Sequence, residues 1–309
     1  MTLPNTEPKL FKHFVDPVDM VMCCPATKSC HKINETAGEH GLRFPLHYDL
    51  NSSVKEHLKV MEFAEGSTRF GSYLDNILGM NWQLSSGKII RIGEQVVKST
   101  TGYDLFKFLL HSDGKLGHAL DYVIRLRPEG GDNFHCQIKG DKTNLEHFQN
   151  SLINSAWVHW IDSLNYITRY NEGEYVELYV NCIPSEKPIF EKHFTKLADD
   201  VGVILSSTKR PQRLLPSLTV KTTISEAIPL ANKYVQKFGG SVVSFPYSGV
   251  VLIHNNDNET LHQDAISYLD EETSRLGGGV YQNQQGITEN NWDTESSWLE
   301  ELQDTWSRL

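Results

Sequence analysis

The chain has 309 residues, of which 39% are hydrophobic and 22% charged, a composition that suits a globular protein of about two domains. The formal net charge of −10 argues against nucleic acid or an anionic membrane as the main partner. Five cysteines without a disulfide-type spacing favour a reducing compartment, and no apolar run is long enough for a signal peptide or a membrane span. We therefore expect a soluble, cytoplasmic protein.

The first part of the chain, residues 1–129, holds irregular loops between short predicted elements. The expected order is a strand over 20–24, a polar helix over 27–40, strands over 79–84 and 88–92, a short helix over 104–111 and a strand over 120–126. The turn-forming stretch from Pro128 to Asp132 then marks a boundary. It divides the chain into two expected domains, 1–129 and 130–309.

The second part of the chain repeats one pattern of elements. Strand, helix, strand, strand, helix and strand follow one another from residue 134 to 206, and the same order recurs from 218 to 282. Two such β-α-β-β-α-β units side by side would form one antiparallel sheet with helices on one face, which gives an α+β fold. A Trp-bearing helix over 295–309 is expected to pack on the first part.

A series of short motifs stands in a fixed order between Ser67 and Pro128. They are Arg69-Phe70-Gly71, Asp75 to Gly79, Lys98 with Gly102-Tyr103-Asp104-Leu105, Ser112 to Gly117, and Arg127-Pro128. In order and spacing, this series resembles the FAD-linked oxidases of the vanillyl-alcohol-oxidase and p-cresol-methylhydroxylase (PCMH) superfamily, and most of all the small FAD-binding subunit of glycolate oxidase. The resemblance implies a PCMH-type FAD-binding domain over 1–129 and a cap domain over 130–309.

The resemblance also implies that this FAD-binding domain is truncated. The family begins with a glycine-rich loop whose backbone N–H groups hold the FAD pyrophosphate, whereas this chain begins at the following strand. A second family motif is replaced by Val60 to Gly66, where Glu62 and Glu65 would be poor neighbours for a diphosphate. FAD is therefore expected to bind weakly or not at all unless another chain completes the site.

The family's cofactor contacts can be carried over to matching positions. The positions implied to contact FAD are Ser67, Thr68, Arg69, Gly71, Gly102, Tyr103, Asp104, Ser112, Gly114, Gly117 and His118. Other interpretations stay open: a tight turn at Gly114 and Gly117, a helix N-cap at Asp104, and a surface loop at 67–69. No catalytic residue is assigned.

Two further clusters have simpler explanations. Cys23, Cys24, Cys30 and His31 lack the spacing of a metal site, and the first two would point to opposite faces of a strand. No metal is therefore expected. The basic run 209–213 is interpreted as a solvated linker between the two repeated units.

The resemblance implies an FAD-linked oxidoreductase subunit acting on a small 2-hydroxy acid such as glycolate or lactate. The alternative is a degenerate, non-catalytic family member. Such a chain would act as a structural or regulatory subunit in a complex of homologous flavin and iron–sulfur chains.

Overall fold

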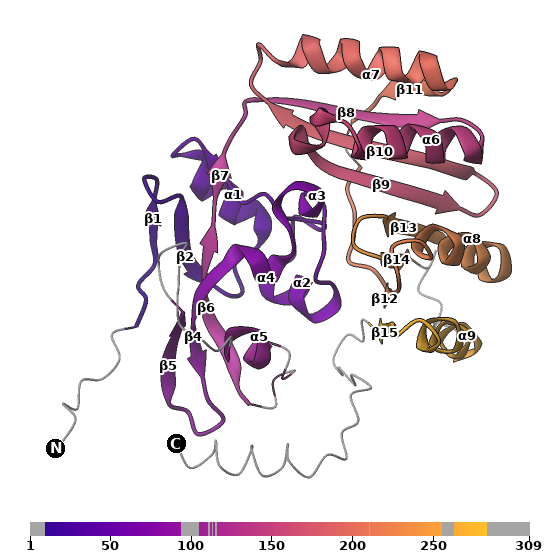
Figure 1. Ribbon diagram of the computed structural model, residues 1–309. Helices are drawn as coiled ribbons and strands as arrows, with labels where there is room; N and C mark the ends of the chain where they lie inside the picture. Colours follow the sequence, from indigo (N-terminus) through magenta and orange to yellow (C-terminus); the bar gives the residue numbers. More distant parts are fainter. Residues whose placement is uncertain are drawn as a thin grey trace.

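The computed structural model describes residues 10–93, 105–110, 112, 114, 116–209, 211–254 and 263–282. Gly102, Tyr103, Asp104 and the helix predicted over 295–309 lie outside these described residues. Two sheets dominate the chain, and each belongs to one part of the sequence (Figure 1). The expected mixture of helices with antiparallel sheets is confirmed.

The first sheet has five antiparallel strands in the order β1-β2-β6-β4-β5. They are β1 (Phe14–Asp16), β2 (Val21–Pro25), β6 (His118–Arg125), β4 (Ile77–Gln83) and β5 (Ile89–Gly93). Four of them lie within a few residues of the predicted strands, and β1 was not predicted. A small ladder of β3 (Leu42–Arg43) with β7 (Arg127–Pro128) leads the chain out of this block.

Short helices cover the first sheet. They are α1 (Cys30–Gly38), α2 (Val54–Val60), α3 (Ser67–Phe70), α4 (Tyr73–Asn76) and α5 (Leu105–Leu110). Serine N-caps begin three of them: Ser29 for α1, and Ser53 and Ser72, each in a complete capping box, for α2 and α4. These caps fix where the three helices begin, even though α4 has only four residues.

The second sheet has eight antiparallel strands in the order β11-β8-β10-β9-β13-β14-β12-β15. Its first half comprises β8 (Asp132–Lys139), α6 (Lys142–Ile153), a 3-10 turn (Ala156–Trp160), β9 (Ile161–Arg169), β10 (Gly173–Cys182), α7 (Lys187–Val201) and β11 (Ile204–Ser207). The second half comprises β12 (Leu218–Lys221), α8 (Ala227–Phe238), β13 (Ser241–Phe245), β14 (Val250–His254), α9 (Gln263–Ser274) and β15 (Gly279–Gln282). The halves join where β13 pairs with β9.

Successive residues along the strands of this sheet pack into different parts of the core, one on each face. On β14, Val251 and Ile253 pack in a cluster with residues of α8 and α9, whereas Val250 and Leu252 pack in the core of the first block. Successive side chains of a strand point to opposite faces, so the helices lie on one face and the first block lies against the other. Within the part of the chain described, no helix is long and apolar enough to cross a membrane.

Candidate functional site

The predicted segment 67–71 lies where the first block meets the eight-stranded sheet. The hydroxyl of Ser67 accepts a hydrogen bond from the N–H of Ala64 at 2.9 Å. The hydroxyl of Thr68 accepts one from the N–H of Leu164 on β9, at 3.3 Å. Arg69 donates to the carboxylate of Asp162, also on β9, at 3.2 Å. The segment is therefore the short helix α3 docked on β9, not a surface loop.

The second predicted group forms the turn between α5 and β6. The N–H of Gly117 donates to the carbonyl of Gly114 at 3.2 Å. Both glycines have a positive φ, +80° at Gly114 and +124° at Gly117. A Cβ at Gly117 would lie 2.0 Å from the carbonyl oxygen of Gln83, whereas one at Gly114 would meet nothing nearer than 3.9 Å. The hydroxyl of Ser112 donates to a backbone carbonyl, and His118 is exposed. Packing against β4 therefore explains Gly117, and Gly114 faces open space.

The two predicted groups lie at opposite ends of β4. Helix α4 leads directly into Ile77, and the Gly117 turn packs against Gln83 at the other end. Seven residues of strand at a rise of about 3.3 Å span roughly 20 Å. The structure therefore does not bring the two groups into one small pocket, and only an extended ligand as long as β4 could contact both.

An ion-pair cluster lies between the first block and the sheet, centred on Arg213. Its guanidinium donates to Glu65 at 2.8 Å and also to Glu177 on β10. The side chains of all three are at most 8% exposed. The interpretation of Arg213 as part of a solvated linker is therefore wrong: the linker carries this side chain into the interface, where two buried carboxylates require a cation.

Tyr48 and His254 extend this cluster. The tyrosine hydroxyl lies 2.7 Å from Nε2 of His254, the two rings stack at 5.7 Å, and the Arg213 guanidinium lies 5.5 Å from the Tyr48 ring centroid. Burial, with Arg213 and Arg169 nearby, lowers the pKa of His254 to about 4, and burial raises the pKa of Tyr48. At neutral pH a neutral imidazole can therefore accept a hydrogen bond from the Tyr48 hydroxyl, which keeps its proton. The sequence did not identify His254 as a member of this cluster, because nothing in the chain near it indicates its partner.

The glutamates that replace the family's second glycine motif have structural partners. Glu62 forms an ion pair with Lys221 on β12, and Glu65 pairs with Arg213. Beside them, the hydroxyl of Thr219 donates to the carbonyl of Val60. Both acidic side chains therefore tie the first block to the sheet.

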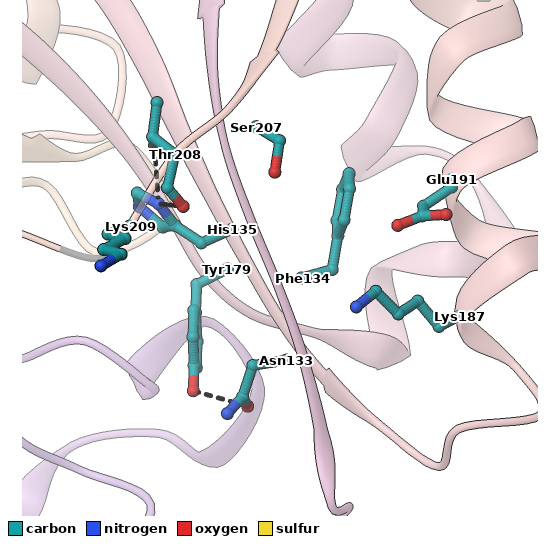
Figure 2. A pocket seen from close by; sticks show the side chains of 9 residues that line it. All are labelled: Asn133, Phe134, His135, Tyr179, Lys187, Glu191, Ser207, Thr208 and Lys209. Atoms are coloured by element: carbon teal, nitrogen blue, oxygen red, sulfur yellow. Dashed lines mark hydrogen bonds between the residues drawn. The ribbon is translucent and has the colours of Figure 1, made fainter.

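A polar pocket of about 370 Å³ lies elsewhere on the sheet, against β8, β10, α7 and the end of β11 (Figure 2). The hydroxyl of Tyr179 donates to Asn133 at 2.8 Å, and that of Thr208 lies 2.9 Å from Nδ1 of His135. Dashed lines in Figure 2 mark both contacts. Lys187 pairs with Asp132 at 3.0 Å. None of the predicted cofactor residues lines this pocket, so it is separate from the predicted site.

Cys23, Cys24 and Cys30 of the first block belong to two different parts of the hydrophobic core. Cys24 and Cys30 pack with the helices, and Cys23 packs with Phe11 and Val123 on the other side of the sheet. Burial raises the pKa of each of these three thiols to about 12. They are packed as small apolar side chains, as is usual for buried cysteines.

A flavin dinucleotide is the group that the resemblance implies. Ser67, Thr68 and Gly117 are engaged by their own chain, and a Cβ at Gly71 would lie 2.7 Å from the carboxylate of Asp75. A ligand can still reach Gly114 and Arg69, whose side chain is 29% exposed. The described residues at these positions thus do not form a complete cradle for a diphosphate, and each stays a prediction as a cofactor contact.

No family model matches the chain. It is 28% identical over 120 residues to a D-lactate dehydrogenase of Archaeoglobus fulgidus, which is 38% of this chain and 27% of that protein. An uncharacterized FAD-linked oxidoreductase of Mycobacterium tuberculosis is 27% identical over 115 residues, 37% of this chain and 25% of its own length. The glycolate oxidase subunit GlcD of Bacillus subtilis is 33% identical over 61 residues, 20% of this chain and 13% of that protein.

The fold is also similar to that of a solved structure, an alkyldihydroxyacetonephosphate synthase. The TM-score is 0.66 at 10% identity, over 97% of this chain and 66% of that chain. This likeness supports the fold alone. The chain spans about a quarter of the length of the first curated relatives. Its homologues are FAD-linked oxidoreductases, as the motifs between Ser67 and Pro128 predicted.

Proposed function

We propose that the chain is part of an FAD-linked oxidoreductase that acts on a small 2-hydroxy acid such as D-lactate or glycolate. The observation that carries the proposal is the sequence similarity to a D-lactate dehydrogenase and to a glycolate oxidase subunit. In this proposal, residues 1–129 belong to a PCMH-type FAD-binding domain and residues 130–309 form its cap domain. FAD is the cofactor that the homologues support.

The interface between the two sheets gives the chain a rigid frame for such a reaction. Arg213 joins Glu65 of the first block to Glu177 of the eight-stranded sheet, and Asp162 joins that sheet to Arg69. Catalytic sites require groups held to a fraction of an ångström, and buried, ion-paired side chains help to hold them so. We assign these residues a positioning role and assign no proton transfer to them.

An absorbance spectrum of the purified protein, repeated after incubation with FAD and desalting, tests the proposal. Flavin bands that persist after desalting and bleach when D-lactate or glycolate is added without oxygen would support it. A protein that stays colourless after incubation with FAD would contradict it for this chain.

Two turn glycines provide a matched pair of variants for this assay. Gly114 and Gly87 have nearly the same φ, +80° and +84°, and a Cβ at either would have open space around it. Asp is tolerated in this left-handed region better than most residues. Gly114→Asp should lower FAD retention, because it places a carboxylate at a predicted contact, and Gly87→Asp should retain FAD as the native chain does.

A second function, that of a non-catalytic subunit, is favoured by one specific observation. Most of the described polar groups at the predicted contact positions bind their own chain, and ion pairs close the interface between the sheets. Such a chain would assemble with a homologous flavin or iron–sulfur subunit. Co-purification of a yellow or brown partner with a chain that remains colourless alone would favour this function.

A further inference from the structure

Four arginines gather at the junction between the first block and the eight-stranded sheet. Arg43 and Arg127 face each other in the β3–β7 ladder, and Arg125 stands two residues before Arg127. Arg69 reaches the same place from α3. Like charges opposite each other on paired strands are destabilising, so this arrangement requires a compensating charge.

Three of the four side chains lie over one aromatic ring. The guanidinium carbons of Arg43, Arg69 and Arg127 lie 5.6, 5.0 and 5.2 Å from the centroid of Phe70. A ring face attracts each cation weakly, but it does not neutralise them. Three positive groups thus share a small, partly buried volume.

One carboxylate balances part of this charge. Asp162, whose side chain is 1% exposed, accepts from Arg43 at 2.5 Å and from Arg69 at 3.2 Å. Arg127 has only neutral acceptors, the amide oxygen of Asn76 and a backbone carbonyl, each at 3.4 Å. Among the residues that the structure describes, neither Arg125 nor Arg127 forms an ion pair, so four cations face one anion.

Two buried donors of the cluster lack acceptors. The Nε atoms of Arg43 and Arg125 are buried without a hydrogen-bond partner in the described part of the chain. The Arg43 side chain is only 8% exposed. Buried polar groups in native structures are nearly always bonded, and a buried donor without a protein acceptor is a place where an anion or a water can bind.

The electrostatics agree with this geometry. Burial, and then the positive charges of Arg125, Arg69 and Arg43, lower the pKa of Arg127 to about 10. A group with so perturbed a pKa marks a site where the protein holds like charges together. An anion at the cluster would relieve that repulsion.

We propose that Arg43, Arg69, Arg125 and Arg127 form a binding site for a phosphate or diphosphate group. The cluster exceeds its own carboxylate by three charges, more than a monocarboxylate can neutralise. Phosphate oxygens accept bonds from several guanidinium groups at once. The site is reached from solvent at Arg69, which is partly exposed, so a small phosphorylated molecule or a dinucleotide can enter.

The test is titration of the full chain with inorganic pyrophosphate by calorimetry, beside thermal unfolding with and without pyrophosphate. Binding heat and a rise in melting temperature are expected, because a ligand that binds only the folded chain stabilises it. The absence of both at millimolar pyrophosphate would overturn the proposal.

Arg125→Met is the informative variant, because Arg125 has no hydrogen-bond or ion-pair partner to lose among the described residues. It should weaken pyrophosphate binding at least tenfold and leave the chain as stable as, or more stable than, the native one in anion-free buffer. Arg275→Met is the matched control: this exposed arginine pairs with Glu271 on α9, away from the cluster. Equal weakening in both variants would show general charge attraction and refute a built site.

A competition experiment between pyrophosphate and bound FAD distinguishes FAD from an unrelated phosphate compound as the natural ligand. If pyrophosphate displaces bound FAD, the FAD diphosphate occupies the arginine cluster; if FAD stays bound, another phosphorylated compound does. Pyrophosphate binding by a chain that does not retain FAD would support this site and contradict the proposed function, so the two can fail separately.

Discussion

Replacing Arg213 with methionine should destabilise the chain more than any exposed substitution. The change keeps much of the aliphatic volume and removes the cation that joins Glu65 to Glu177. Both carboxylates then remain buried, at 5% and 4% side-chain exposure, without the Arg213 cation. The folded state must keep these charges away from water without that cation or open the interface to hydrate them.

The expected loss follows from that burial. Removing one partner of a buried ion pair costs about 3–5 kcal/mol, chiefly because the remaining charge is uncompensated. For a chain of this size, each kcal/mol lowers the melting temperature by roughly 2–4 °C. We therefore expect a fall of roughly 6–20 °C in the melting temperature.

Urea and thermal unfolding of Arg213→Met and Arg275→Met measure this directly. The control removes an ion pair whose side chains are 70% and 68% exposed, and such pairs contribute at most about 1 kcal/mol. Arg213→Lys keeps the charge without the two-pronged geometry and should fall between the native chain and Arg213→Met. If Arg213→Met unfolds within about 1 kcal/mol of the control, the cluster does not hold the two sheets together.

Three further predictions concern other parts of the chain. His254 has a pKa of about 4 in the folded chain and about 6.5 in the unfolded chain. Its contribution to the free energy of unfolding is therefore fully present above pH 6.5, and about 3 kcal/mol of it is lost as the pH falls to 4. Urea unfolding across this pH range should show the loss, and His254→Gln should remove this pH dependence. Gly117→Ala should lower the free energy of unfolding by more than about 3 kcal/mol, because its Cβ would lie 2.0 Å from a carbonyl oxygen. Gly114→Ala, which has open space around it, should lower it by about 1–2 kcal/mol. Equal losses of stability in urea unfolding would contradict the packing role of Gly117. The five cysteines are buried, so a thiol reagent at pH 8 should label them only after urea unfolds the chain, and rapid labelling of the native protein would refute their burial.

Periodicity accounts for most of what the sequence revealed of the fold. Val250 to Ile253 packs alternately on two faces, and the helix pattern around Ala227 to Phe238 likewise follows from one buried stripe. Local spacing is enough for such elements, and so the repeated order of strands and helices could be predicted. The order in which the two units join in one sheet depends on pairing between strands far apart in the sequence. A repeat indicates that such pairing exists but does not determine which strands pair.

Some missed elements did have a signal. Ser53 with Glu56, and Ser72 with Asp75, are the spacing of a capping box, and reading them would have predicted α2 and α4. Strand β1, with only three residues, carries no comparable signal.

The candidate site could be predicted only in part, because its partners are far apart in the chain. Arg213 is separated by 148 residues from Glu65 and by 36 from Glu177. No spacing rule links such positions, and a basic run beside prolines is more often a solvated linker. A motif located Arg69, but only the fold shows that it shares Asp162 with Arg43.

The two charged clusters at this interface have charge balances of opposite sign. That difference indicates a structural role for one cluster and a ligand-binding role for the other. At Arg213, one cation meets two carboxylates, and the Arg213 guanidinium contacts both directly. Around Phe70, three cations, with Arg125 beside Arg127 as a fourth, meet one carboxylate, and two buried donors have no acceptor among the described residues. In the first arrangement the cation is paired with a carboxylate of each block, and Oε1 of Glu177 is the buried atom of this cluster without a hydrogen-bond partner among the described residues. The second holds an excess of positive charge, so it is the place where a phosphate-bearing ligand would contribute most to the folded state.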